Sequence, residues 1–279
     1  MTTVDTTITG PAGVPAQYTF AGDTGDDHAA QQRRVLAEIL DADSISVLSQ
    51  LDIPPGARCL DVGAGAGTIT AWLAEKATPA GHVTALDLNT SQIPARTNVT
   101  ALTGDVRTTD LPEASFDLVH ARAVLVFLPD REQVLRRLAT ALRPGGVIVI
   151  SDWTDPTTRT LLHAPSPAAA QAYETYQTLV PAIMLANGAD TSWGPRVPIA
   201  MRDCDLTDVN TVVHNRLWYG GQAGHLLHLH NSYLLQDALL ARGMTTDQLD
   251  LLRAAVTDSQ TMAYLFPMHT TTGRRATEQ

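Results

Sequence analysis

The chain has 279 residues and a formal net charge of −10, from 29 acidic and 19 basic residues. No basic stripe suited to nucleic-acid phosphates is visible in the sequence, so we expect no nucleic-acid partner. Two cysteines, Cys59 and Cys204, do not make a disulfide framework or a zinc site, and a reduced, cytoplasmic setting is the simplest interpretation. We also expect neither a membrane span nor a secretory leader.

The first residues of the sequence show no regular spacing of apolar side chains. Residues 1–17 are rich in Thr, Ala, Gly and Pro and are predicted to form a disordered arm. Residues 18–56 are predicted to hold N-terminal helices, in two groups of helical spacing with Asp41 and Asp43 breaking or capping between them. Pro54-Pro55-Gly56 ends this region.

Residues 57–153 alternate between short apolar runs and helical patterns. Strands are predicted at 59–62, 82–86, 98–102, 116–120 and 147–150, with helices at 68–77 and 131–142. This alternation is typical of a parallel sheet covered by helices on both faces. The predicted fold class is therefore α/β, doubly wound and mostly parallel.

The alternation fades after residue 153. Helices are predicted at 165–187, 224–240 and 246–256, and strands at 208–218 and 262–270, the last despite Pro267. We expect residues 154–279 to supply lid helices and the last strands of the same domain.

A glycine cluster between the first strand and the next helix carries the strongest signal. Residues 60–68 read Leu-Asp-Val-Gly-Ala-Gly-Ala-Gly-Thr, and such a turn lets a ligand approach the backbone and the helix N-terminus. The spacing departs from a dinucleotide fingerprint, because Thr68 stands where a third small residue is expected. Asp87 ends the following strand, where an acidic side chain accepts from the ribose hydroxyls of an adenosine cofactor.

With these residues, the sequence resembles the Rossmann-like S-adenosylmethionine-dependent methyltransferases. The resemblance rests on five segments in order, at 60–68, 83–89, 104–106, 116–122 and 142–152. The chain ends, through residues 18–20 and 273–275, look like a group of actinobacterial small-molecule methyltransferases. The resemblance implies a seven-stranded sheet whose last strand, near 262–270, runs antiparallel at one edge.

The resemblance also implies a role for each matching residue. Asp61 would orient the loop and the methionine amine, Asp87 would hold the ribose hydroxyls, and Leu88 would pack on adenine. Asp105 would accept from the adenine amino group, and the Val106 N–H would reach a ring nitrogen. The remaining implied cofactor contacts, to the methionine and ribose, are Gly63, Ala64, Gly65, Gly67, Tyr18 and the backbone of His120 and Ala121.

Methyl transfer from a sulfonium is an in-line displacement in which positioning supplies ~7–11 kcal/mol, so a catalytic side chain is not obligatory. Where a base is used, the candidates are His120, Asp152 and His163, although a strand-end histidine bonded to backbone is the simpler interpretation of His120. The residues expected in the acceptor pocket, partly through a lid over 160–235, are Arg122, Trp153, Tyr173, Tyr176, Trp193 and Trp218. An ordinary helical layer is the alternative to the lid.

His225, His228 and His230 raise the question of a metal. Only the first two share a helix face, and the full ligand set of metal-dependent relatives is not recognisable, so no metal is predicted.

The predicted function is methyl transfer from S-adenosylmethionine to oxygen, nitrogen or carbon of a small, fairly apolar molecule of specialised metabolism. Three alternatives stay open: C-methylation of an isoprenoid-type alkene with a cation-driven rearrangement, a non-methylating S-adenosylmethionine binder, and an NAD-dependent oxidoreductase. A homo-oligomer through the N-terminal helices is also left open.

Overall fold

The computed structural model describes residues 8–9, 15–16, 19–20, 27–155 and 160–277. The chain divides into two compact units. The sheet unit comprises residues 41–154, 192–214 and 268–279, and the helical unit comprises residues 1–40, 155–191 and 215–267. The limits predicted from sequence, at 18–56, 57–153 and 154–279, do not coincide with these units, because the segment after residue 153 contributes to both.

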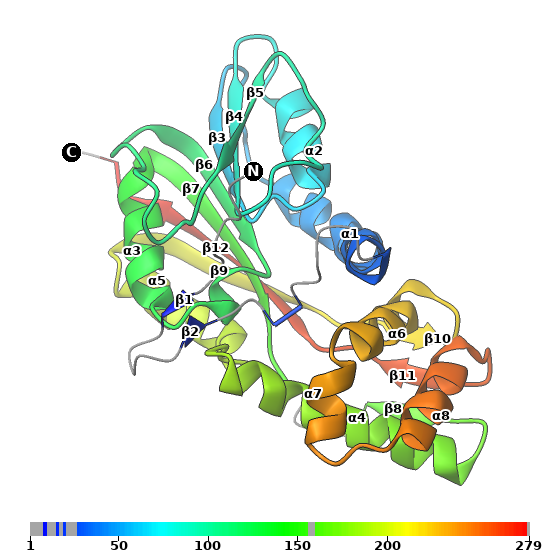
Figure 1. Ribbon diagram of the computed structural model, residues 1–279. Helices are drawn as coiled ribbons and strands as arrows, with labels where there is room; N and C mark the ends of the chain where they lie inside the picture. Colours follow the sequence, from blue (N-terminus) through cyan, green and yellow to red (C-terminus); the bar gives the residue numbers. More distant parts are fainter. Residues whose placement is uncertain (1–7, 10–14, 17–18, 21–26, 156–159, 278–279) are drawn as a thin grey trace, which may run out of the picture. The chain divides into compact units, whose positions relative to one another are not determined.

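A seven-stranded sheet forms the centre of the sheet unit (Figure 1). Its order is β5-β4-β3-β6-β7-β12-β9, and β12 runs antiparallel to both of its neighbours while the other printed pairings are parallel. The strands are β3 (Arg58–Val62), β4 (His82–Asp87), β5 (Val99–Thr103), β6 (Phe116–Arg122), β7 (Leu142–Trp153), β9 (Leu206–His214) and β12 (Met268–Arg275). The predicted α/β, mostly parallel fold class is confirmed.

The predicted last strand is corrected in position. The range 262–270 is interrupted: β11 (Met262–Tyr264) pairs in a separate sheet, and β12 begins at Met268 after Pro267, which has no N–H to donate to a ladder. β12 lies between β7 and β9 and is not at the edge, which β9 forms instead. The predicted strand 208–218 is likewise two strands, β9 and β10 (Leu217–Tyr219), in different sheets.

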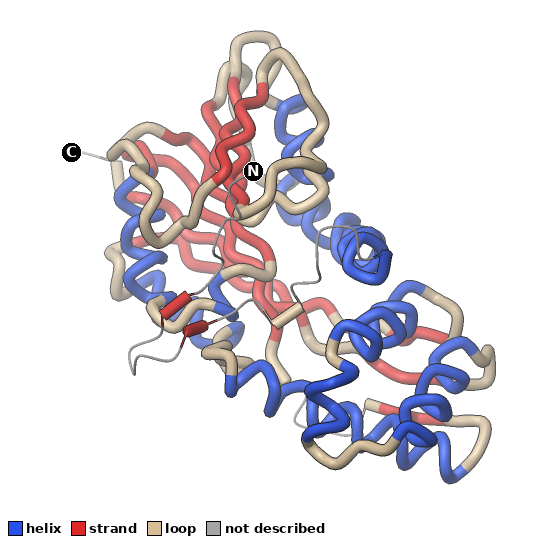
Figure 2. The backbone as a smooth tube through the Cα atoms, viewed as in Figure 1, coloured by secondary structure: helices blue, strands red, loops and turns tan. Residues whose placement is uncertain are grey.

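Helices cover both faces of the seven-stranded sheet (Figures 1 and 2). On one face, α2 (Thr68–Lys76) and the end of α1 pack on Cys59, Leu118 and Val149 through Val47, Leu48, Ile69, Leu73 and Ala74. On the other lie α3 (Arg131–Ala141) and α5 (Val197–Arg202). Because side chains alternate along a strand, residues 147, 149 and 151 of β7 face the first layer and residues 148, 150 and 152 the second.

One long helix, α1 (Asp27–Leu48), replaces the two helical groups predicted for the N-terminal region. Asp41 and Asp43 do not break it, because both carboxylates find partners outside the helix: Asp41 pairs with Arg122 at 2.9 Å and Asp43 with His214 at 3.5 Å. These contacts offset the tendency of aspartate to leave a helix interior for a cap.

The helical unit contains α4 (Pro167–Ala186), α6 (Ala223–Leu234), α7 (Gln236–Ala241) and α8 (Thr246–Thr257). A three-stranded sheet of order β10-β11-β8, with β8 at Leu161–His163, belongs to the same unit. The predicted helix 224–240 divides at Leu235 into α6 and α7. Ser166 caps α4 by accepting from the Ala169 N–H at 3.1 Å, where sequence placed the start of this helix.

Two short helices and one strand pair complete the described elements. The 3-10 helices are η1 (Leu125–Phe127) and η2 (Gly194–Arg196). β1 (Ile8–Thr9) pairs antiparallel with β2 (Pro15–Ala16), within the range predicted as a disordered arm; the rest of that range lies outside the described residues. No helix among the described residues is both long and apolar enough to cross a membrane.

Candidate cofactor site

The glycine loop joins β3 to α2 with three left-handed glycines. Gly63, Gly65 and Gly67 have φ of 68°, 55° and 75°, a region that side chains disfavour. Each glycine has a different surrounding. A Cβ on Gly63 would lie 2.2 Å from Val124 Cγ2 and one on Gly67 2.9 Å from Pro94 Cδ, whereas one on Gly65 would meet nothing closer than 3.9 Å. The first and third glycines therefore permit close packing, and the second leaves space above the loop.

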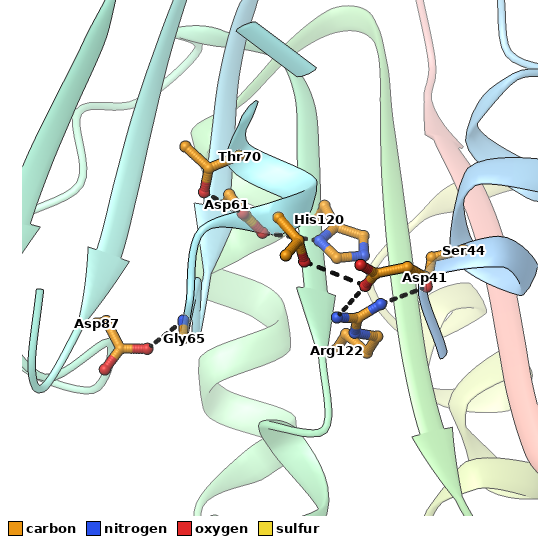
Figure 3. A network of polar contacts seen from close by, with 9 residues as sticks. Asp41, Ser44, Asp61, Gly65, Thr70, Asp87, His120 and Arg122 are labelled. Atoms are coloured by element: carbon orange, nitrogen blue, oxygen red, sulfur yellow. Dashed lines mark hydrogen bonds and ion pairs between the residues drawn. The ribbon is translucent and has the colours of Figure 1, made fainter. Parts of the chain in front are cut away.

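Asp87 ties the end of β4 to this loop (Figure 3). Its Oδ2 accepts from the Gly65 N–H at 2.8 Å, and its Oδ1 accepts from the Asn89 N–H at 2.9 Å. A carboxylate oxygen has two lone pairs, so each oxygen retains one for a further donor. The structure therefore brings together Gly65 and Asp87, which sequence analysis assigned to one cofactor. Leu88, the next residue, is half-buried.

Asp105 follows β5 and is held by Arg107. Both carboxylate oxygens accept from the guanidinium, with Nε 3.0 Å from each, and Oδ1 also accepts from the Arg107 N–H at 2.9 Å. Burial alone would raise the pKa of Asp105, but the hydrogen bonds and charge of Arg107, with the charge of Arg137, lower it overall. Arg137 also donates to the carbonyl of Val106 at 2.6 Å. Neither arginine was expected at the site from the sequence, although Arg107 stands only two positions after Asp105.

Asp61 and His120 form a buried pair on neighbouring strands. Their Cα positions are paired across β3 and β6, and Asp61 Oδ1 lies 2.8 Å from His120 Nδ1 (Figure 3). The Thr70 hydroxyl donates to Asp61 Oδ2 at 2.5 Å. Because a carboxylate only accepts, the pair fixes the tautomer of the neutral imidazole, with the proton on Nδ1 and the lone pair on Nε2. That Nε2 is buried and has no hydrogen-bond partner among the described residues.

Arg122 extends the polar layer from the end of β6 to α1. Its guanidinium donates to Ser44 Oγ at 3.0 Å and pairs with Asp41 at 2.9 Å. Asp41 also accepts from the hydroxyl of Thr68, the first residue of α2, at 3.1 Å. The arginine predicted to line an acceptor pocket is thus engaged by α1. Nothing in the periodicity of the sequence indicates this contact, because its partners are 78 or more positions apart.

Asp152 lies on the opposite face of the sheet from His120. Its side chain is fully buried, and neither oxygen makes a hydrogen bond of good geometry with the described residues. Burial raises the pKa of Asp152 to about 8, although the backbone amides of Val126 and Val124, the charge of Arg131 and the Trp193 indole act in the other direction. The structure therefore places Asp152 and His120, two of the three predicted catalytic side chains, on opposite faces of the sheet.

The third candidate, His163, lies on β8 in the helical unit. It is exposed, and its Nδ1 donates to the backbone carbonyl of Gln260 at 2.8 Å. The helical unit also holds Tyr173 and Tyr176 on α4 and Trp218 on β10.

The two remaining tryptophans predicted for the pocket belong to the sheet unit. Trp153 packs edge-on against Phe127 with ring centroids 5.1 Å apart. Trp193 is fully buried, with the guanidinium groups of Arg131 and Arg196 at 6.0 and 5.4 Å from its ring centre. The predicted aromatic set is thus divided between the two units.

Tyr18 lies outside the described residues. Among the residues that are described, no group of three or more His, Cys, Asp or Glu side chains converges in a way suited to a metal ion. His230, the third histidine of α6, lies with its Nδ1 3.1 Å from that of His28.

Comparison with known proteins places residues 60–150 in a family described as the methyltransferase domain. The methyltransferase GfsG of Streptomyces halstedii is 35% identical over 127 residues, which are 42% of this chain and 45% of that protein. The methyltransferase str2 of Strobilurus tenacellus is 36% identical over 115 residues, 38% of each chain. The chain thus spans less than half the length of these two curated relatives.

A solved structure of phosphoethanolamine N-methyltransferase 2 from Haemonchus contortus, in complex with phosphomonomethylethanolamine and S-adenosylhomocysteine, has the same fold. The two agree with a TM-score of 0.55 at 14% identity, over 94% of this chain and 62% of that one. The matched family segment begins within β3 and ends within β7, so it contains the glycine loop, Asp87, Asp105 and the Asp61–His120 pair. Residues 60–150 therefore match a methyltransferase domain, and the matched segment carries the loop and strand-end residues described above.

Proposed function

We propose that this protein transfers the methyl group of S-adenosylmethionine to a small, fairly apolar molecule. The observation that carries the proposal is the pairing of Gly65 with Asp87 in a loop of three left-handed glycines. Ligands of open α/β sheets bind outside the carboxyl ends of the strands, and both residues lie there.

The described residues fit this cofactor. The space above Gly65 admits a ligand to the loop backbone, and the free N-terminal amides of α2 follow directly. Asp87 would accept from the two ribose hydroxyls with the lone pairs that Gly65 and Asn89 leave free. We assign Asp105 and Val106 to the adenine edge, with Arg107 fixing the carboxylate of Asp105.

When bound, S-adenosylmethionine would supply a methyl group on a positively charged sulfur, and the sulfur would depart as a neutral thioether with the carbon–sulfur electron pair as the acceptor's lone pair bonds to the carbon. Protein groups must then hold the acceptor in line and, for an acceptor that starts protonated, take one proton. We assign His120 as the base that accepts this proton. Asp61 fixes the tautomer of the neutral imidazole, so that the lone pair able to accept the proton is on Nε2.

Thermal unfolding in the presence of S-adenosylhomocysteine tests the cofactor assignment. At 100 times its dissociation constant a ligand adds ~2.7 kcal/mol to stability, which raises the unfolding midpoint by roughly 5 °C in a chain of this size. The shift should be lost in Asp87→Ala and kept in Asp110→Ala, which removes an exposed carboxylate from the same unit. A shift with NAD alone would support the oxidoreductase alternative and overturn the proposal.

Product analysis then separates methyl transfer from mere binding. A candidate acceptor that gains the mass of one methyl group, with equimolar S-adenosylhomocysteine, identifies a methyltransferase. Binding of S-adenosylhomocysteine with no mass gain in any acceptor of a broad screen would favour the non-methylating alternative. A methylated product with a changed carbon skeleton would favour the alkene reaction.

A further inference from the structure

Four buried polar atoms that lack a well-formed hydrogen bond gather in the helical unit. Tyr173 and Tyr176 lie three positions apart on α4, and His225 and His228 lie three positions apart on α6, so each pair shares a helix face. Their rings contact one another edge to face. The ring centroids are 5.8 Å apart for Tyr173 and His225, 5.6 Å for Tyr173 and His228, and 5.4 Å for Tyr176 and His228.

One polar atom on each ring is buried and makes no hydrogen bond of good geometry with the described residues, although the Asn231 side chain interacts with the Tyr176 hydroxyl and acts to lower its pKa. These atoms are the hydroxyls of Tyr173 and Tyr176, Nδ1 of His225 and Nε2 of His228. Tyr173, Tyr176 and His225 are at most 1% exposed. Buried polar groups in folded proteins are nearly always well paired, so four such atoms in one cluster indicate a partner beyond the protein's own side chains.

The cluster has no net charge with which to balance an ion. Burial lowers the pKa of His228 to about 3 and also lowers that of His225, so both imidazoles are neutral. Burial raises the pKa of both tyrosines far above neutrality, so both phenols keep their protons. An ionic ligand would therefore be desolvated here without a counter-charge.

The hydrogen-bonding pattern calls for a group that both donates and accepts. His225 Nε2 donates to the carbonyl of Trp218 at 3.2 Å, which leaves its Nδ1 as an acceptor. The tyrosine hydroxyls are available as donors. A carbonyl or ether oxygen would satisfy the donors and leave His225 Nδ1 unpaired, whereas a hydroxyl satisfies both kinds of group.

We propose that the cluster of Tyr173, Tyr176, His225 and His228 is a binding site for the hydroxyl group of a small uncharged phenol. A phenolic hydroxyl is a stronger donor to a neutral imidazole than an aliphatic one, and its ring continues the edge-to-face packing of the four side chains. The proposal concerns the helical unit by itself and does not depend on methyl transfer.

Histidine ring signals in a ¹H–¹³C correlation spectrum of the whole 279-residue chain test the site. Phenol, anisole and benzene form a matched series. Phenol both donates and accepts hydrogen bonds, anisole only accepts them, and benzene does neither. H225Q and H228Q identify the signals of His225 and His228. These signals should shift at phenol concentrations at least roughly fivefold below those needed with anisole or benzene, as expected for one added hydrogen bond. The exposed His163 of the same unit is the internal control.

Two conservative variants complete the test. Y173F and Y176F keep the rings and remove the orphaned hydroxyls, so each should reduce the preference for phenol over benzene. Y264F removes a hydroxyl from an exposed tyrosine and should leave that preference unchanged. Equal shifts with phenol and benzene, or no shift at His225 and His228, would overturn the proposal and leave ordered water as the partner of these atoms.

Discussion

Asp152 offers a sharp test of how burial acts on an ionisable group in this sheet. Its pKa is raised from 3.8 to about 8 by burial, so the folded protein binds a proton there that the unfolded chain releases above pH 4. A group of this kind contributes its full stability below the unfolded pKa and loses it as pH rises towards the folded pKa. The wild-type protein should therefore lose stability relative to a variant without the carboxyl as pH rises from 4 to 8.

The size of the effect follows from the two pKa values. Each pH unit between them is worth about 1.4 kcal/mol, so the shift from 3.8 to about 8 sets an upper limit of about 6 kcal/mol across the whole window. Asp152→Asn keeps the size of the side chain and cannot ionise. The difference in unfolding free energy, wild type minus variant, should thus fall steadily between pH 4 and pH 8.

Urea unfolding at pH 4, 5, 6, 7 and 8 measures this difference, with Asp110→Asn as the control at an exposed position of the same unit. The control difference should vary far less with pH. A flat difference for Asp152→Asn would refute the reasoning, because it would mean that the carboxyl ionises as readily in the fold as in the unfolded chain. Such a result would also revive Asp152 as an ionised group able to act on an acceptor.

Three further substitutions test the sheet unit. Gly63→Ala should lower the free energy of unfolding by about 1–3 kcal/mol in denaturant and weaken S-adenosylhomocysteine binding. The added Cβ would lie 2.2 Å from Val124 Cγ2, and residue 63 has a φ of 68°. V124A in the same chain should recover part of the lost stability. Arg107→Met should raise the pKa of Asp105, which carboxyl NMR titration measures. The stability that wild type gains over this variant should shrink as pH falls through the pKa of Asp105 in the folded protein, because a lowered folded-state pKa stabilises the fold only while the carboxylate is ionised. His120→Gln should lower the methyl-transfer rate about 10²–10⁴-fold for a protonated acceptor in a product assay while keeping the midpoint shift with S-adenosylhomocysteine; an unchanged rate would exclude His120 as the base.

The sheet could be predicted because its signals are local. Fully apolar runs such as residues 147–150 need burial on two faces, and the glycine loop needs positive φ at fixed positions, so both are visible in a short window of sequence. Asp87 was identified for the same reason, since its place at a strand end is a matter of spacing.

The placement of the last strands could not be obtained in this way. An alternating pattern in β12 does not reveal whether its neighbour is β7 alone or β7 and β9, because pairing depends on residues more than 50 positions away. The small sheet of β8, β10 and β11 escaped prediction for a related reason. Its strands are three residues long, too short to show a period, and they are stabilised by each other.

Asp41 shows most clearly how non-local contacts change the meaning of a residue. By local chemistry an aspartate between two apolar groups favours a helix break, yet α1 continues through it. Its carboxylate accepts from Thr68 at the start of α2 and pairs with Arg122 at the end of β6. One side chain therefore connects α1 to the two elements that flank the proposed cofactor site. Because Arg122 is a partly buried cation and Asp41 its ion-pair partner, the helix that sequence would divide at residue 41 is stabilised there by the sheet.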